Sequence, residues 1–209
     1  QTKVTPGITG YQAVLDDFEQ SLSNLETNYV DVYFIHWPVN RGSEKTYHDE
    51  NVEIWNAFEY LYEVGKVKKL GVCNFLERHL VDIWDNCRVK PTVHQLEIHP
   101  GYQQIGLVEY SQKLGMEIEA WSPMGRGELK NKIYIDMADR YGCNTGQLAL
   151  KWSLQKGYTP LSRSKTKEHI IHNRILDFTI AEEDMKKIDE LNTNTNYLDI
   201  WSYKRQQMY

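Results

Sequence analysis

Apolar residues recur along this chain with two alternating patterns, one typical of helices and one typical of buried strands. Apolar positions three or four residues apart predict a helix over residues 11–25 and another over residues 52–62 that ends before Gly65. Short runs rich in β-branched and aromatic residues, such as residues 30–35, predict strands between the helices. No Pro/Gly/Ser-rich linker interrupts this alternation, which is typical of parallel β/α architecture.

The full pattern predicts six strands and a helix after each. The expected strands cover residues 3–4, 30–38, 69–75, 93–100, 116–123 and 158–164. The later expected helices cover residues 76–87, 107–114, 131–141, 145–156 and 167–173, and a last helix begins with the capping-box pattern Thr179-x-x-Glu182. A complete barrel of eight such units needs about 250 residues. The sequence therefore predicts an α/β fold, a (β/α)8 TIM barrel without its first two strand–helix units, as one N-terminally incomplete domain over residues 1–209.

The composition is that of a globular protein and argues against a nucleic-acid-binding or membrane-spanning one. The chain is 41% hydrophobic and 25% charged with a net charge of −5, which is ordinary for a globular protein. It has no Lys/Arg-rich run that would favour nucleic acid, and no apolar run long enough to cross a membrane. The residues at the start of the sequence are not expected to act as a signal peptide. Three widely spaced cysteines match no zinc or disulfide framework, which favours the cytoplasm.

One expected strand delivers a histidine to its C-terminal end. Val30 to Ile35 form the strand, His36 follows and Pro38 stops it. In parallel barrels the catalytic groups lie at this end of the strands, and histidine exchanges protons near neutral pH. The alternative is that His36 only bonds a neighbouring backbone group.

The other strands also end on polar or stacking side chains. These are Lys3, Cys73 with Asn74, Gln95 with His99, Trp121 with Ser122, and Arg163 with Ser164. The set holds two amides suited to a carboxamide, an aromatic ring suited to stacking and a basic residue suited to phosphate. It contains no acidic or Cys/His cage, so no metal is expected. This inventory fits a nicotinamide dinucleotide across the barrel mouth.

Five motifs in order resemble the aldo-keto reductase family, over roughly residues 1–192. They are Thr2-Lys3 with Ser21-Leu22, Leu25, Tyr29 and Asp31; Ile35-His36-Trp37-Pro38; Gly65-Lys66 with Gly71-Val72-Cys73-Asn74-Phe75; His94-Gln95-Leu96-Glu97-Ile98-His99-Pro100; and Ala120-Trp121-Ser122-Pro123-Met124-Gly125. The resemblance implies metal-free, NAD(P)H-dependent reduction of an aldehyde or ketone by direct hydride transfer.

The resemblance also implies roles in catalysis. Lys3 matches the lysine whose ammonium group eases proton donation by a tyrosine, and His36 matches the histidine that orients the substrate carbonyl. Trp37 is expected to line the substrate pocket.

For the cofactor, the resemblance implies eight binding residues. They are Asn74 and Gln95 on the carboxamide, Trp121 stacked on the nicotinamide, Ser122 at a phosphate, Arg163 and Ser164 at the 2′-phosphate, and His169 and Asn173 further along the same segment. His169 and His172 stand where the family has arginine and glutamate, and a neutral histidine holds a phosphate less well. NADP(H) is therefore expected over NAD(H), with a weakened preference.

Other departures from the family pattern concern the strand ends. Cys73 replaces a serine, which removes a strong hydrogen-bonding group, and His94 replaces an asparagine. The family aspartate and tyrosine would precede Lys3, in units that this sequence does not contain. The 209 residues alone are therefore expected to be inactive, and open strand edges are expected to make them aggregate.

Two kinds of protein remain open at this stage. One is a cytoplasmic NADP-dependent oxidoreductase, a monomer or weak homo-oligomer when full length, acting on a small carbonyl substrate. The other is a redox-inactive cofactor-binding or interaction subunit of the same fold. The loops over residues 40–51 and 126–130 and the tail after Asn192, with Trp201 and Tyr203, are expected to shape the substrate pocket.

Overall fold

The computed structural model describes residues 1–38, 44–127 and 129–194, without the side chains of residues 44–47 and 126. Residues 40–43 and 128 of the two loops expected to shape the substrate pocket, and residues 195–209 of the tail with Trp201 and Tyr203, lie outside the described residues. The loop expected over residues 40–51 is wrong from Glu44 onward, because the helix predicted to begin at residue 52 begins at Glu44. The described chain divides into two compact units. The first comprises Gln1–Gln95 and Tyr110–Glu117, and the second comprises Leu96–Glu109 and residues 118–194. The single domain over residues 1–209 stays a prediction.

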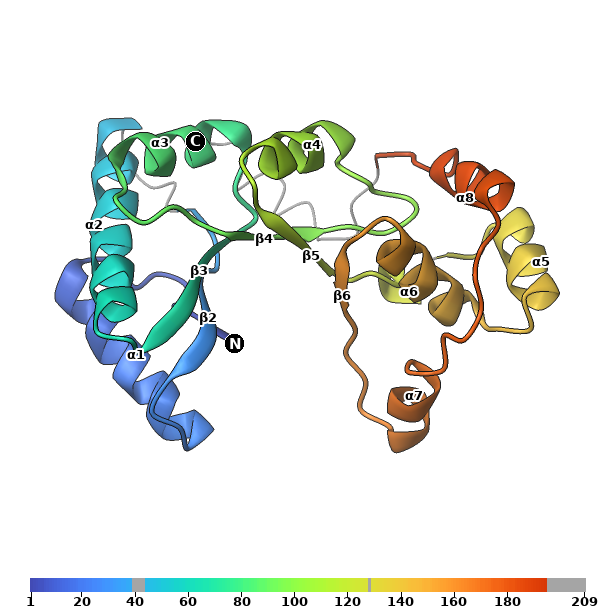
Figure 1. Cartoon of the computed structure of the whole chain (residues 1–209), viewed down its shortest axis with the longest axis horizontal. Coiled ribbons are helices and arrows are strands. Elements are labelled where there is room, and N and C mark those ends of the chain that lie inside the picture. Colours follow the sequence, from blue (N-terminus) through green and yellow to red (C-terminus); the bar gives the residue numbers. More distant parts are fainter. Residues whose placement is uncertain (39–43, 128, 195–209) are drawn as a thin grey trace. The chain divides into compact units, whose positions relative to one another are not determined.

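The first unit is built on parallel strands in chain order. β1 (Thr2–Lys3) pairs with β2 (Val30–Ile35), β2 with β3 (Val67–Cys73), and β3 with the start of β4 (Val93–Glu97). The helices between them are α1 (Tyr11–Leu25), α2 (Glu44–Glu63) and α3 (Glu77–Asn86), and α1 and α2 lie beside one another along β2 and β3 (Figure 1). The register aligns Lys3 with Phe34 and Cys73 with Gln95, so the C-terminal ends of these strands lie along one edge.

Aromatic side chains form much of the core of the first unit. The rings of Tyr33 and Phe58 stack with centroids 4.3 Å apart, and Phe18 of α1 meets Tyr33 edge-on at 4.9 Å. Phe34, the next residue of β2, points to the opposite face of the sheet. Its ring lies directly on the backbone of β3, where a Cβ at Gly71 would be 2.5 Å from its ring carbons. A glycine is therefore required at this close approach.

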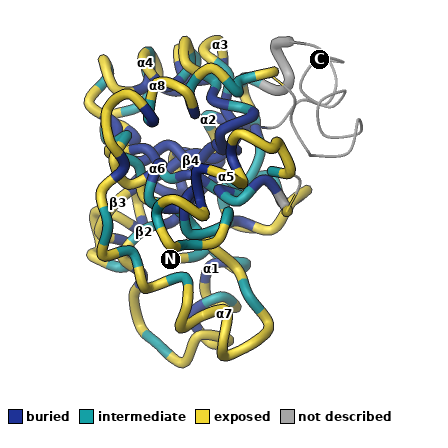
Figure 2. The backbone as a smooth tube through the Cα atoms, turned by 90° about the vertical axis from the view of Figure 1, so that its right-hand side faces the viewer, coloured by how far each residue is buried: buried dark blue, intermediate teal, exposed yellow. Residues whose placement is uncertain are grey.

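The second unit contains the later strands and helices. β5 (Glu117–Trp121) pairs in parallel with β6 (Thr159–Leu161), and a short 3-10 turn, η1 (Gly125–Gly127), follows β5. α4 (Ile105–Lys113) begins in the second unit and ends in the first. The other helices of the second unit are α5 (Lys132–Arg140), α6 (Thr145–Gln155), α7 (Lys167–His172) and α8 (Glu182–Asp189). Buried side chains of α5, α6 and α8, among them Tyr134, Trp152 and Ile188, form its core, whereas α7 is largely exposed (Figure 2). The predicted alternation of parallel strands with helices is confirmed.

Two predicted boundaries are wrong in this region. The strand expected over residues 158–164 stops at Leu161, so Arg163 and Ser164 lie in the loop that follows it. The last helix begins at Glu182 with Ala181 as its N-cap, and not with Thr179 in a capping box. The hydroxyl of Tyr141 accepts the N–H of Ala181 at 2.9 Å, so a tertiary contact replaces the local cap.

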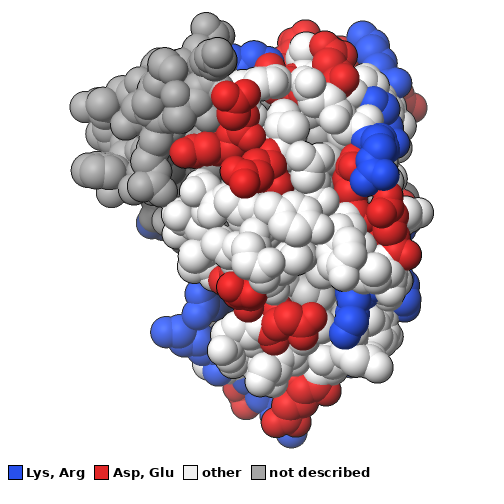
Figure 3. All heavy atoms as spheres, turned by 90° about the vertical axis from the view of Figure 1, so that its left-hand side faces the viewer, with Lys and Arg blue, Asp and Glu red and all other residues white. Residues whose placement is uncertain are grey.

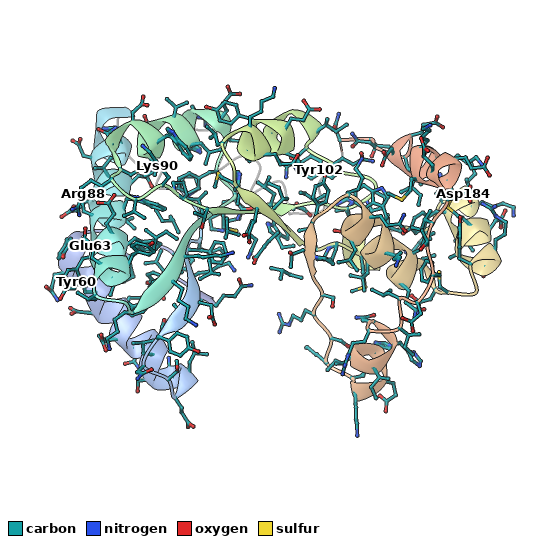
Figure 4. All side chains as sticks on the ribbon, viewed as in Figure 1. Tyr60, Glu63, Arg88, Lys90, Tyr102 and Asp184 are labelled. Atoms are coloured by element: carbon teal, nitrogen blue, oxygen red, sulfur yellow. The ribbon has the colours of Figure 1, made fainter. Side chains whose placement is uncertain are left out.

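The carboxylate of Asp184 joins α8 to α5. It is 2% exposed and accepts hydrogen bonds from Arg140 at 3.0 Å, from the Tyr141 hydroxyl at 2.9 Å and from Lys187 at 3.1 Å (Figure 4). Burial by itself raises the pKa of Asp184, but these three hydrogen bonds outweigh it and lower the pKa to about 2.

We expect this carboxylate to make the protein sensitive to acid. Its folded pKa of about 2 lies below the ordinary value of 3.8, so its stabilisation is complete above pH 3.8 and is lost as the pH falls toward 2. The free energy of unfolding, measured in urea between these pH values, will depend less on pH in Asp184→Asn than in the wild-type protein. The exposed neighbour Glu183 provides the matched control, and a Glu183→Asn variant that flattens the profile equally would contradict the assignment.

The surface of the first unit carries mixed charge. On the face shown in Figure 3, acidic and basic side chains are interspersed around a neutral area. Within the described ranges, no helix combines the length and the apolar character needed to span a membrane. The same residues include no group of three His, Cys, Asp or Glu side chains placed to hold a metal ion.

Candidate active site

His36 follows directly after the last residue of β2. Its side chain is half-buried, and the pKa of its imidazole is lowered by burial and, second, by the positive charge of Lys3. The ring is therefore neutral at pH 7, with one nitrogen that donates a hydrogen bond and one that accepts. This is the form in which a histidine polarises a carbonyl without carrying charge.

Lys3 ends β1 beside the strand that carries His36. Its Nζ lies 5.1 Å from the centroid of the buried Phe34 ring, and the backbone N–H of Val4 bonds the carbonyl of Phe34 at 2.9 Å. The parallel register thus holds the ammonium group at the same strand edge as His36. The predicted grouping of Lys3 with His36 is present in the structure.

The amides of Asn74 and Gln95 belong to the next two strands: Asn74 follows directly after β3, and Gln95 lies in the middle of β4, opposite the last residue of β3. Asn74 Nδ2 donates to the backbone carbonyl of His36 at 3.1 Å, and the backbone N–H of Asn74 bonds the carbonyl of Gln95 at 3.0 Å. Asn74 adopts the left-handed conformation with φ 61°, which asparagine tolerates better than most residues. Both amides are buried, so their orientations are set by protein partners rather than by water.

Trp37 lies next to His36 with its ring half-buried. The two ring centroids are 6.3 Å apart and the planes are inclined by 27°. This places an apolar surface beside the imidazole. Its contact with substrate stays a prediction.

In the second unit, Trp121 and Ser122 come at the end of β5. Trp121 is paired with Leu161 of β6, and its carbonyl accepts the N–H of Ile98 at 3.3 Å. Ser122 has a φ of 51°, and its carbonyl accepts the N–H of Gly125 at 2.9 Å, which closes a tight turn. Both side chains are half-buried at this turn.

The remaining predicted cofactor residues lie on one segment between β6 and the end of α7. Arg163 and His169 are exposed, and Asn173 is half-buried as the last residue of the helical turn. The Ser164 hydroxyl accepts the N–H of Thr166 at 3.2 Å and so shapes the entry to α7. The structure thus holds Arg163, Ser164, His169 and Asn173 together within the second unit, and Lys3, His36, Trp37, Asn74 and Gln95 together within the first.

Two residues that position this site do not stand out in the sequence. Phe34 is one of several strand-forming residues between residues 30 and 35, yet its ring supports the Lys3 side chain. Gln147 of α6 donates from Nε2 to the carbonyls of His172 at 3.0 Å and Ile175 at 2.9 Å, on either side of Asn173. Its capping box with Asn144 is visible in the sequence, whereas the contact of Phe34 with Lys3 depends on strand register.

Comparison with known proteins gives matches over nearly the whole chain. A model of the Aldo/keto reductase family matches residues 2–193. Two proteins of Bacillus subtilis are each 40% identical to this chain. The uncharacterized oxidoreductase YtbE matches over 196 residues, which are 92% of this chain and 67% of the relative. A glyoxal reductase matches over 185 residues, which are 88% of this chain and 64% of the relative. A crystal structure of a Gox0644 mutant in complex with NADPH is 30% identical, with a TM-score of 0.87 over 95% of this chain and 72% of that one.

These matches confirm the fold class that the sequence predicted. The structural similarity extends over the parallel strands and their helices, which are strand–helix units of a (β/α)8 TIM barrel. The chain spans about two thirds of the length of the two Bacillus relatives.

Proposed function

Because the chain belongs to the aldo/keto reductase family, we propose that the protein reduces an aldehyde or ketone to an alcohol by direct hydride transfer from a nicotinamide dinucleotide. The observation that carries the proposal is the neutral His36 imidazole beside the Lys3 ammonium group at one strand edge. A small carbonyl compound is the proposed substrate class, and the name of the glyoxal reductase supports it.

The two buried amides suit the carboxamide group of the cofactor. Asn74 and Gln95 are amides, and amides match the one donor group and one acceptor group of a carboxamide. Trp121 and Ser122 would bind the nicotinamide and a phosphate, and Arg163, Ser164, His169 and Asn173 would bind the adenosine end. When bound, the dihydronicotinamide supplies the hydride. NADP(H) is proposed over NAD(H), since Arg163 suits a phosphate and the Gox0644 structure holds NADPH.

The chemistry of this chain's own residues follows from their charge and position. A ring nitrogen of neutral His36 donates a hydrogen bond to the carbonyl oxygen, which makes the carbonyl carbon a better acceptor. The Lys3 ammonium group stabilises negative charge that develops on that oxygen, and it lowers the pKa of any acid placed beside it. Trp37 would exclude water from one side of the imidazole.

A cytoplasmic location and a monomeric or weakly associating state are part of the same proposal. Cys73, Cys87 and Cys143 are all free thiols, as is usual in a reducing compartment.

The test uses the full-length protein that carries this chain. NADPH labelled with deuterium at the transferred position is mixed with glyoxal, and the product is analysed by mass spectrometry. We expect consumption of NADPH, slower consumption of NADH, and one deuterium in the alcohol product. Tight NADPH binding without turnover of any small aldehyde or ketone would instead favour the redox-inactive subunit.

A further inference from the structure

Residues 173–181 form the joining segment between α7 and α8, and they contain no helix or strand. In Figure 1 the joining segment runs from α7 past α6 to α8. Backbone carbonyls in such a segment bond to side chains or water, because no helix or sheet pairs them. Here the side chains are Gln147, Lys151 and Gln155, which are four residues apart and so lie along one side of α6.

Two of these side chains bind the backbone around Asn173. Gln147 Nε2 donates to the carbonyls of His172 at 3.0 Å and Ile175 at 2.9 Å. Lys151 Nζ donates to the next carbonyl, that of residue 176, at 3.0 Å. The backbone on both sides of Asn173 is therefore attached to α6.

The two halves of the joining segment differ in what else holds them. In the second half, Ile180 is buried and Phe178 packs against the core of the second unit. Gln155 adds a bond from Nε2 to the Ile180 carbonyl at 3.0 Å and accepts its N–H at 2.8 Å. In the first half, Ile175 is 51% exposed, so its backbone depends more on the polar contact from Gln147 than on burial.

The amide of Gln147 is held in one orientation by partners of fixed character. Its Oε1 accepts the backbone N–H of Asn144 at 3.0 Å, and the carbonyls of His172 and Ile175 can only accept from Nε2. The His172 carbonyl also accepts the N–H of Ile175 at 3.0 Å, which closes the turn that contains Asn173. Gln147 thus joins the first turn of α6 to this turn.

We propose that Gln147 is a positioning residue that sets the affinity of the protein for the adenosine end of the dinucleotide, by holding the backbone on both sides of Asn173. This inference rests on the proposed function, since it assumes that Asn173 binds the adenosine end. An asparagine amide bonds the edge of an adenine ring through one donor and one acceptor, which requires a fixed position. Without Gln147 the ligand has to order this turn as it binds, and that cost lowers the affinity.

Three variants of the full-length protein separate this role from general stability. Gln147→Met keeps the length of the side chain and its helix propensity but removes the amide. Gln155→Met makes the same change at the other end of the row, where Ile180 stays buried. Asn144→Ala removes the side-chain cap of α6 but keeps the backbone N–H that Gln147 accepts. Thermal melting verifies that each variant folds.

The first measurement uses calorimetric titration with NADPH and with adenosine 2′,5′-bisphosphate, which is the adenosine end alone. For Gln147→Met we expect Kd for both ligands to rise about fivefold, the effect of one neutral hydrogen bond. The rate of hydride transfer at saturating NADPH should stay within about twofold, because the reacting end of the cofactor is not affected. Gln155→Met and Asn144→Ala should change Kd by about twofold or less.

Three results of this measurement overturn the inference. One is an unchanged Kd in Gln147→Met. Another is equal weakening in Gln147→Met and in either control, which would show an effect of stability alone. The third is a loss of hydride-transfer rate as large as the loss of affinity.

The second measurement needs no cofactor. In the free protein, the N–H of Ile175 should exchange with solvent about fivefold faster in Gln147→Met, and at the wild-type rate in Gln155→Met. Unchanged exchange in Gln147→Met would refute the link to α6 even where NADPH binds normally. A wild-type protein that binds neither NADPH nor adenosine 2′,5′-bisphosphate would instead overturn the proposed function, and with it the role toward the cofactor.

Discussion

Replacing His36 with alanine will lower kcat for carbonyl reduction in the full-length protein about 100-fold or more, the usual cost of losing a donor to a developing oxyanion. The imidazole is neutral because burial and the Lys3 charge lower its pKa, so it acts as a hydrogen-bond donor and not as a counter-ion. The bond from Asn74 reaches the backbone carbonyl of residue 36, which alanine keeps. NADPH affinity should therefore change about twofold or less.

Stopped-flow kinetics and NADPH titration separate these two effects. The matched control is Gln20→Ala, since Gln20 is an exposed residue of α1 whose side-chain amide bonds the side chain of Asn24 at 3.1 Å. It should leave both kcat and Kd unchanged. Parallel losses of kcat and NADPH affinity in His36→Ala would count against the assigned role.

Replacing Glu59 with alanine will lower the free energy of unfolding by about 3 kcal/mol. The Glu59 carboxylate is 1% exposed and accepts the backbone N–H groups of Arg88 at 2.5 Å and Val89 at 2.9 Å. It also accepts a hydrogen bond from Nε of Arg88 at 2.9 Å. Alanine leaves the two backbone donors without this acceptor, and it removes the link between α2 and the loop after α3.

Glu63 offers a matched control on the same helix. Its carboxylate lies 2.9 Å from Nη1 of Arg88, but the side chain is 48% exposed and the pair lies at the surface (Figure 4). Glu63→Ala should therefore cost about 1 kcal/mol or less. Chemical denaturation of both variants provides the comparison. Equal losses would show that the ion pair with Arg88, and not the buried backbone contacts, accounts for the effect of Glu59.

The positions of the secondary-structure elements are largely a property of the sequence. Helix α1 covers Tyr11–Leu25, as the spacing of its apolar residues predicts, because one apolar face every 3.6 residues can be buried only by a helix. His36 was placed at a strand end for a similar reason, since Pro38 cannot continue a strand. Short elements were less predictable: the start of α8 depends on the Tyr141 hydroxyl, which lies 40 residues earlier in the chain.

What only the tertiary structure decided is which side chains meet across strands. The sequence identified Asn74 and Gln95 as a pair of amides and Cys73 as a weak substitute for serine. Strand register brings the Cys73 thiol between those amides and sets the ring of Phe34 beneath Lys3. Local preferences carry no information on register, because parallel pairing is determined by how separate strands pack together. The sequence thus determines which residues make up the candidate site, and the fold determines the directions of the hydrogen bonds between them.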